Sequence, residues 1–168
     1  MKLARMRFML APALLVLMLA YQGVFAVQVM VSDVLNFNVQ RLMVFWEVDG
    51  NKPAAGEVAA ALEQMQWAVK LWPHHPDYLA LQARLQWWQG QIAPSRQAAN
   101  ANYKLAIATM HQSLVARPGN PYSWSQYASY LATQRDKKIE LLLVVDKVGR
   151  LAAGNKDLQK QMQALVQN

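Results

Sequence analysis

The chain has 168 residues, a formal net charge of +7 and no cysteine. The lack of cysteine excludes a disulfide-stapled scaffold, a thiolate metal site and a cysteine nucleophile. Beyond the basic amino terminus, 14 basic and 10 acidic residues are dispersed along the chain. This mild charge, without a recognised binding motif, argues against nucleic acid as a partner.

The first predicted element is a transmembrane helix at residues 8–31, which follows a basic tail at residues 1–7. No residue of the predicted helix carries a formal charge, and a bilayer core needs roughly 20 apolar residues of helix. The tail carries Lys2, Arg5 and Arg7, which favour a cytoplasmic amino terminus. The rest of the chain is therefore expected outside the cytoplasm.

The same segment has a second interpretation, a cleaved signal peptide. Phe8–Ala20 has about the length of the apolar region of a signal peptide, and Val24-Phe25-Ala26 offers small residues at the two recognition positions before a cut. Against cleavage after Ala26, the apolar residues continue to Val31, and a secreted product would have to bury them elsewhere. An uncleaved anchor is the favoured interpretation, and cleavage is the alternative.

A connecting helix and loop, residues 32–53, is expected between the membrane and a helical domain at residues 54–168. The helix of this segment covers about residues 33–47. It either starts anew at a capping residue, Ser32 or Asp33, or continues the transmembrane helix without a break. The sequence leaves both arrangements open.

Six further helices are predicted because apolar residues recur at spacings of three and four. No turn of the hairpin type lies between alternating apolar and polar runs. The predicted fold class is therefore all-α, with antiparallel helical hairpins stacked on one another after the transmembrane helix. The expected helices cover residues 54–72, 76–90, 95–117, 121–134, 137–152 and 155–167.

Proline, glycine and asparagine mark the junctions between these helices. At the second junction, Gly119 is expected to end a helix in the left-handed conformation. Asn120 is expected to cap the next helix, and Pro121 to occupy its first position. The residues predicted to have structural roles at the three junctions are Pro73, Pro76, Pro118, Gly119, Asn120, Pro121, Gly154 and Asn155.

One segment has the residue pattern of a known helical repeat. Large, large, small and large residues follow the second junction at Trp124, Tyr127, Ala128 and Leu131. With these positions, residues 121–153 resemble a tetratricopeptide unit, and the 35 residues between Gly119 and Gly154 are close to that family's period of about 34. The preceding interval is 45 residues, so only a tetratricopeptide-like stack is expected.

A second pattern covers most of the chain. It consists of the basic start, the single span and a series of tryptophans and helix junctions: Phe45-Trp46, Leu71-Trp72-Pro73, Pro76-Asp77-Tyr78-Leu79, Trp87-Trp88, and Arg117-Pro118-Gly119-Asn120-Pro121 with Trp124. This pattern resembles small membrane-anchored proteins of the VpsP-type exopolysaccharide biosynthesis family. The resemblance implies a role in exopolysaccharide biosynthesis or export. It also implies a bacterial inner membrane with the carboxyl-terminal domain in the periplasm, and it supplies no catalytic residues.

The search for catalytic motifs is negative. The chain has no phosphate-binding glycine loop, no His-Glu-x-x-His helix and no Gly-x-Ser-x-Gly elbow. His74 and His75, with Asp77 close by, come nearest to a metal-ligand pattern. Adjacent histidines in an extended turn tend to point apart, and His111 is expected on a helix surface. We therefore predict no catalytic, metal-binding or cofactor-binding residues and no enzyme activity.

The six tryptophans suggest a surface for a partner. Trp87 and Trp88 are about 100° apart on a helix, so both cannot face the same direction. With Trp88 on the apolar stripe, Trp87 is expected at the surface. Trp87 and Tyr122 are the predicted partner surface, suited to a protein pocket or to stacking on a sugar ring.

Three functional hypotheses follow from these observations. The first is a membrane-anchored, non-enzymatic scaffold that holds a protein of an envelope polysaccharide assembly. The second is a soluble periplasmic adaptor, released by cleavage after Ala26. The third is a small glycan-acting or metal-dependent enzyme, which requires convergent carboxylates or histidines in a pocket.

Overall fold

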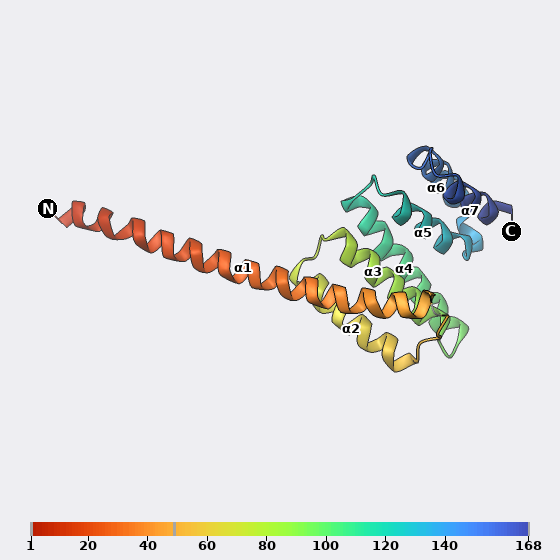
Figure 1. The fold of residues 1–168 in the computed structure, drawn as a ribbon, viewed down its shortest axis with the longest axis horizontal. Helices are drawn as coiled ribbons and strands as arrows, with labels where there is room; N and C mark the ends of the chain where they lie inside the picture. Colours follow the sequence, from red (N-terminus) through yellow and green to blue (C-terminus); the bar gives the residue numbers. More distant parts are fainter. Residues whose placement is uncertain (1, 49, 168) are drawn as a thin grey trace.

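A computed structural model of the chain describes residues 2–48 and 50–167; the side chains of residues 2–13, 48 and 135 lie outside the description. Every regular element in these ranges is a helix, which confirms the all-α fold class (Figure 1). The predicted helices agree with the observed ones within two or three residues, apart from the first. The elements are α1 Lys2–Val48, α2 Ala55–Leu71, α3 Pro76–Gln91, α4 Arg96–Ala116, α5 Pro121–Ala132, the short 3-10 helix η1 Arg135–Lys137, α6 Lys138–Leu151 and α7 Lys156–Gln167.

Helix α1 runs without a break from the apolar amino-terminal segment into the helical domain (Figure 1). Ser32 does not cap a new helix, because its hydroxyl donates a hydrogen bond to the Gln28 carbonyl one turn earlier, at 2.8 Å. Within the described side chains, the part of α1 from Leu14 to Glu47 is long and apolar enough to cross a membrane; a signal sequence near the amino terminus would meet the same criterion. The side chains of the basic tail lie outside the description.

The second half of α1 belongs to the core of the helical domain. Val39, Met43 and Trp46 are buried in one cluster with side chains of α2 and α3. The predicted boundary at residue 54 therefore falls between residues that share one core. The remaining buried members of this α1–α3 core are Val58, Ala61, Leu62, Met65, Ala68, Tyr78, Leu81 and Leu85.

A second cluster, the α3–α7 core, holds the carboxyl-terminal helices together. Each helix packs against its neighbours in sequence, and α5 also contacts α7. Alanines at the contacts, such as Ala83, Ala106 and Ala128, allow the helices to approach closely. The larger buried members of this core are Met110, Leu114, Tyr127, Tyr130, Leu131, Leu141, Val144, Val148, Leu158 and Met162.

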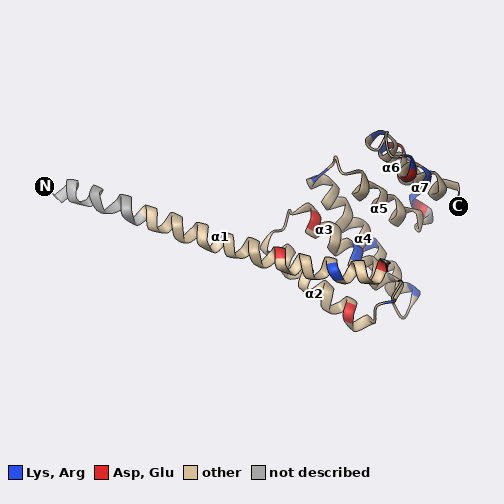
Figure 2. Cartoon of the chain, in the orientation of Figure 1, with Lys and Arg blue, Asp and Glu red and all other residues tan. Residues whose placement is uncertain are grey.

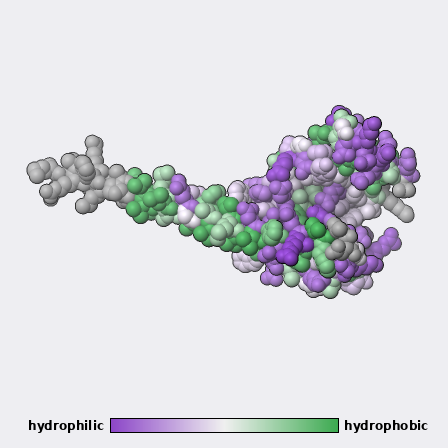
Figure 3. Space-filling model, viewed as in Figure 1, coloured by the Kyte–Doolittle hydropathy of each residue, from purple (hydrophilic) through white to green (hydrophobic). Residues whose placement is uncertain are grey.

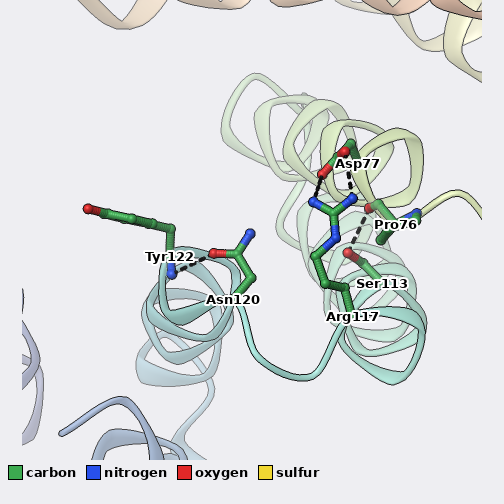
Figure 4. Close-up of polar contacts among 6 residues, drawn as sticks. All are labelled: Pro76, Asp77, Ser113, Arg117, Asn120 and Tyr122. Carbon is green, nitrogen blue, oxygen red and sulfur yellow. Dashed lines mark hydrogen bonds and ion pairs between the residues drawn. The ribbon is translucent and has the colours of Figure 1, made fainter. Parts of the chain in front are cut away.

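The junctions use proline and asparagine as predicted. Pro76 and Pro121 occupy the first turns of α3 and α5. The Asn120 side chain accepts a hydrogen bond from the Tyr122 amide at 3.0 Å (Figure 4), and that of Asn155 accepts one from the Leu158 amide at 3.1 Å. Each asparagine therefore satisfies an amide that has no partner within its own helix.

The glycines of the junctions do not have the predicted conformation. Among the described residues, positive φ occurs at Gly50 alone, in the loop between α1 and α2, and thus at neither Gly119 nor Gly154. Helix α4 ends instead at Arg117. The Arg117 amide donates the last hydrogen bond of the helix, to the Ser113 carbonyl, and its extended backbone (φ −139°, ψ 80°) then directs the chain out of the helix. The left-handed conformation expected at Gly119 is therefore wrong.

Side-chain hydrogen bonds and an ion pair connect the end of α4 to the start of α3. The Ser113 hydroxyl donates to the Pro76 carbonyl at 2.7 Å, and the two terminal nitrogens of Arg117 donate to the Asp77 carboxylate at 2.8 and 3.0 Å (Figure 4). A guanidinium that binds both oxygens of a carboxylate fixes orientation as well as distance. These contacts hold the α2–α3 and α4–α5 junctions at the same end of the helix stack.

Candidate binding groove

The two residues of the predicted partner surface, Trp87 and Tyr122, differ in exposure. Tyr122 is 64% exposed at the start of α5. The Trp87 ring is half-buried, stacked on Tyr130 and against Tyr103, both at 4.4 Å between ring centroids. Trp87 therefore packs between α3, α4 and α5 with part of its side chain exposed, and is less exposed than the sequence predicts. Trp88 packs on the opposite core, with its ring 6.3 Å from that of Trp46.

Helix α4 lines two adjoining cavities, which we call the α4 groove. The first cavity, about 530 Å³, lies between α4, α5, η1 and the start of α6. The second, about 660 Å³, lies between α4, the α2–α3 junction and α3. His111 and Gln112 belong to the walls of both cavities, so the cavities lie side by side along α4.

The first cavity is the more polar of the two and contains a hydrogen-bonded cluster. The Tyr127 hydroxyl and the Lys137 ammonium both donate to the Glu140 carboxylate, the ammonium at 3.0 Å. The hydrogen bond from Tyr127 holds the pKa of the Glu140 carboxyl below its usual range, partial burial opposes it, and Lys137 adds to the lowering. Burial, followed by the bond to Glu140, raises the pKa of Tyr127. At neutral pH, Glu140 is thus ionised and already satisfied by two donors.

The wall of the polar cavity carries two lysines, Lys104 and Lys137, and two acidic residues, Asp136 and Glu140, so its formal charges balance. Lys104 is exposed and makes no ion pair with a described residue, whereas Lys137 is paired with Glu140. Asp136 is the other acidic residue of this wall, and His111 and Gln112 add polar atoms between the two cavities. A ligand in this cavity would meet hydrogen-bond donors, the Lys104 ammonium and the Asp136 carboxylate, neither of which makes an ion pair with a described residue.

The second cavity is largely apolar. Val69 and Pro73 come from α2 and the junction after it, Leu79 from α3, and Val115 and Ala116 from the end of α4. Val115 is 70% exposed at the mouth of this cavity. Exposed apolar side chains around a concavity are typical of a binding site.

The histidines and acidic residues singled out from the sequence do not converge. His74 is exposed, while the His75 ring stacks on Tyr78 at 4.0 Å between centroids. The Asp77 carboxylate binds Arg117 instead of facing the histidines. Among the described residues, no group of three or more histidine or acidic side chains is placed to hold a metal ion.

Tyr122 lies by a smaller cavity on another face of the molecule. This cavity, about 200 Å³, is formed by α1, α3 and α5, and its wall includes Gln40, Asp77, Arg84 and Gln126. Its volume is well under half that of either part of the α4 groove. The α4 groove therefore offers more room for a bound segment than the cavity beside Tyr122 does.

Sequence reasoning did not find the α4 groove. Its residues are ordinary for helix surfaces, and only the contacts among four elements make them neighbours. One signal was available: Val115 breaks the polar face of α4, because the stripe that includes Met110 and Leu114 already supplies its buried face. No family model matches this chain, and no curated protein matches it.

Proposed function

We propose that this protein is a membrane-anchored, non-enzymatic helical scaffold that holds a segment of a partner protein in the α4 groove. The observation that carries the proposal is the pair of adjoining cavities along one helix, apolar towards the α2–α3 junction and polar towards α6. A helix or extended peptide with an apolar end and a polar end suits such a groove. The tetratricopeptide-like sequence pattern supports the same kind of function.

Two observations support retention of the anchor over cleavage after Ala26. Helix α1 is continuous through this position. The Phe25 ring, just before the alternative cut, contacts Trp72 of the helical domain at 5.7 Å between centroids. Cleavage would remove this contact and start the mature chain inside a helix.

The resemblance to the VpsP type supports a place for this scaffold in envelope exopolysaccharide biosynthesis or export. In that setting the amino terminus is cytoplasmic, the helical domain is periplasmic, and the partner is a component of the polysaccharide assembly. The anchor would concentrate the groove near partners in the same membrane.

Site-specific crosslinking tests the groove. A photo-crosslinking amino acid at Gln112, which both cavities share, is expected to capture a specific membrane or periplasmic protein in cells. The same amino acid at Gln163, exposed on α7, is the matched control. The double variant Lys104→Glu, Val115→Glu should abolish capture at Gln112, because it introduces negative charge into both cavities. Equal capture at the two positions, or capture unaffected by the double variant, would contradict the proposal.

Two further measurements separate the remaining parts of the proposal. Amino-terminal sequencing of the membrane-bound protein should give Met1, whereas a soluble product beginning at Val27 would establish the released adaptor. Identification of the crosslinked protein as a polysaccharide synthase or export component would support the proposed pathway class. An unrelated partner would leave the scaffold standing and remove the polysaccharide role.

A further inference from the structure

We propose that the α2–α3 junction lies in the lipid headgroup layer, so that the helical domain is seated on the bilayer in one orientation. The residues that would enter this layer are Trp67, Lys70, Trp72 and His74, which we call the junction patch. This inference rests on the membrane anchor of the proposed function and does not require a partner in the α4 groove, although His74 also lines the apolar cavity of that groove.

The packing of α2 against α1 sets the position of the junction patch along α1. Trp46, near the end of α1, shares a core with Val58, near the start of α2. At the other end of this antiparallel pair, Phe25 contacts Trp72. The Tyr78 hydroxyl, one turn into α3, donates a hydrogen bond to the Asp33 carboxylate. The junction is therefore level with the last part of the apolar run, about where Phe25 lies.

The length of the apolar run places this level at the membrane boundary. A helix rises 1.5 Å per residue, and a hydrocarbon core about 30 Å thick takes roughly 20 residues. Counted from Phe8, the first residue of the uncharged run, such a span ends close to Val27. Among the described side chains of α1, from Leu14 onward, the first charged one is that of Asp33, and Figure 2 shows no charged residue on the coloured part of α1 before the helix meets the domain.

Because α1 does not break, the helical domain has no flexible stalk. Helix α1 continues from the span into the domain, and each of its residues adds about 1.5 Å of length. Phe25 already contacts Trp72, the residue after α2, before the uncharged run ends. Figure 3 shows hydrophobic surface along α1 up to the place where the domain begins. The domain cannot move away from the bilayer without bending α1 or breaking the Phe25–Trp72 contact.

The junction patch has the chemistry of a membrane interface. Trp67 is 53% exposed, and the Lys70 ammonium lies 4.8 Å from the centre of its ring. Trp72 is half-buried and His74 is exposed. Tryptophan prefers the headgroup level, and lysine reaches from there towards water and lipid phosphate. No acidic residue occurs from Trp67 to His75. The carboxylates next to the patch are already engaged, that of Asp33 by the Tyr78 hydroxyl and that of Asp77 by Arg117, which limits repulsion of anionic headgroups.

Single cysteines provide a direct test because the described chain and the full sequence contain none. His74→Cys places a label in the junction patch. Asn51→Cys and Arg96→Cys place labels at the opposite end of the stack, in the α1–α2 loop and at the start of α4. All three positions are exposed, so the variants should fold. Each full-length protein is labelled with a fluorophore and reconstituted into phosphatidylcholine–phosphatidylglycerol vesicles that contain lipid with a nitroxide on its headgroup.

The expected result is strong quenching at His74→Cys, at least threefold greater than at Asn51→Cys and Arg96→Cys. Equal weak quenching at all three positions would overturn the proposal, because the domain would then stand away from the bilayer. Equal strong quenching would also overturn it, because the domain would then lie flat. Flotation of the unlabelled protein with the vesicles tests the anchor separately. A protein that fails to float contradicts the proposed anchor, whereas one that floats without the quenching difference contradicts this inference alone.

Discussion

Gly90 marks the closest approach between α3 and α4. A Cβ atom at this position would lie 2.3 Å from the Tyr103 ring, well inside contact distance. The Tyr103 ring has little freedom to move away, because Trp87 packs against it and is itself stacked on Tyr130. Gly90, in the last turn of α3, therefore serves the packing of two helices.

We predict that Gly90→Ala destabilises the protein by about 1–3 kcal/mol, because it overpacks this contact. Gly149→Ala in α6 is the matched control. No atom lies within 4 Å of the Cβ added there, so alanine should stabilise the helix by about 0.5–1 kcal/mol. Thermal and urea unfolding of the protein in detergent would measure both changes. Equal melting temperatures for the two variants would show that Tyr103 yields without cost.

A side chain at Gly119, unlike one at Gly90, is expected to be tolerated. Its φ is not positive and its added Cβ meets no atom within 4 Å, so Gly119→Val should change stability by no more than about 0.5 kcal/mol. Asn120→Ala in the same junction should cost about 1 kcal/mol, because the Tyr122 amide loses its acceptor. The two melting temperatures should therefore differ in that order. A large loss for Gly119→Val alone would restore the left-handed assignment.

This junction shows which local features the sequence predicts well. Pro121 and Asn120 act through their own ring and side chain, so their roles follow from residue type and position. The conformation of Gly119 depends on how α4 ends, and that end is determined by Arg117 and its contact with Asp77, 40 residues earlier. Such a distant contact leaves no periodic signal in the sequence.

At the scale of whole elements, Tyr127, Glu140 and Lys137 join α5 to the start of α6. The pKa of Glu140 is lowered in the folded protein, so its ionised form stabilises the fold above the carboxyl's unfolded pKa of about 4.3. This contribution is lost as the pH falls through the folded pKa. The bond from the Tyr127 hydroxyl is the main cause of the lowering.

We predict that Tyr127→Phe raises the pKa of Glu140 towards its usual value and weakens the acid dependence of stability. Carboxyl-carbon NMR of Glu140 would give the pKa, and thermal melts between pH 7 and pH 3 would give the stability. Tyr122→Phe is the control, since the exposed Tyr122 does not contact Glu140. An unchanged Glu140 titration in Tyr127→Phe would mean that Lys137 alone lowers the pKa.

Helix periodicity predicts the elements but not all of their contacts. Spacings of three and four correctly assign the buried face of α2, which packs on one side. Helix α3 lies between the α1–α3 core and the α3–α7 core, so it is covered on two sides. Trp87 and Trp88 therefore both pack, one in each core. The sequence prediction assumed that α3 buries one face, and it placed Trp87 on the solvent side for this reason. It did not include the packing of α3 against α4 and α5.

At the scale of the whole molecule, α1 is both the apolar amino-terminal segment and the first helix of the domain. The α1–α3 core depends on it, because Val39, Met43 and Trp46 fill the space beside α2 and α3. The ion pair between Arg84 and Glu47 adds a polar contact at the same end. The hydropathy of the sequence changes near residue 32, which suggests that the apolar helix and the domain are separate units. In the structure, the two parts of α1 form one helix, and its second part packs in the core of the domain.

We predict that a chain beginning at residue 50 fails to fold, whereas a chain beginning at residue 21 retains the helical domain. A finer test compares neighbours on α1. Trp46 is 3% exposed and Phe45 is 51% exposed, so Trp46→Ala should destabilise by about 3–5 kcal/mol and Phe45→Ala by less than about 1 kcal/mol. Circular dichroism melts in detergent would measure all four proteins. Cooperative unfolding of the chain from residue 50 at the full-length temperature would show that the domain is independent of α1 and begins near residue 54 after all.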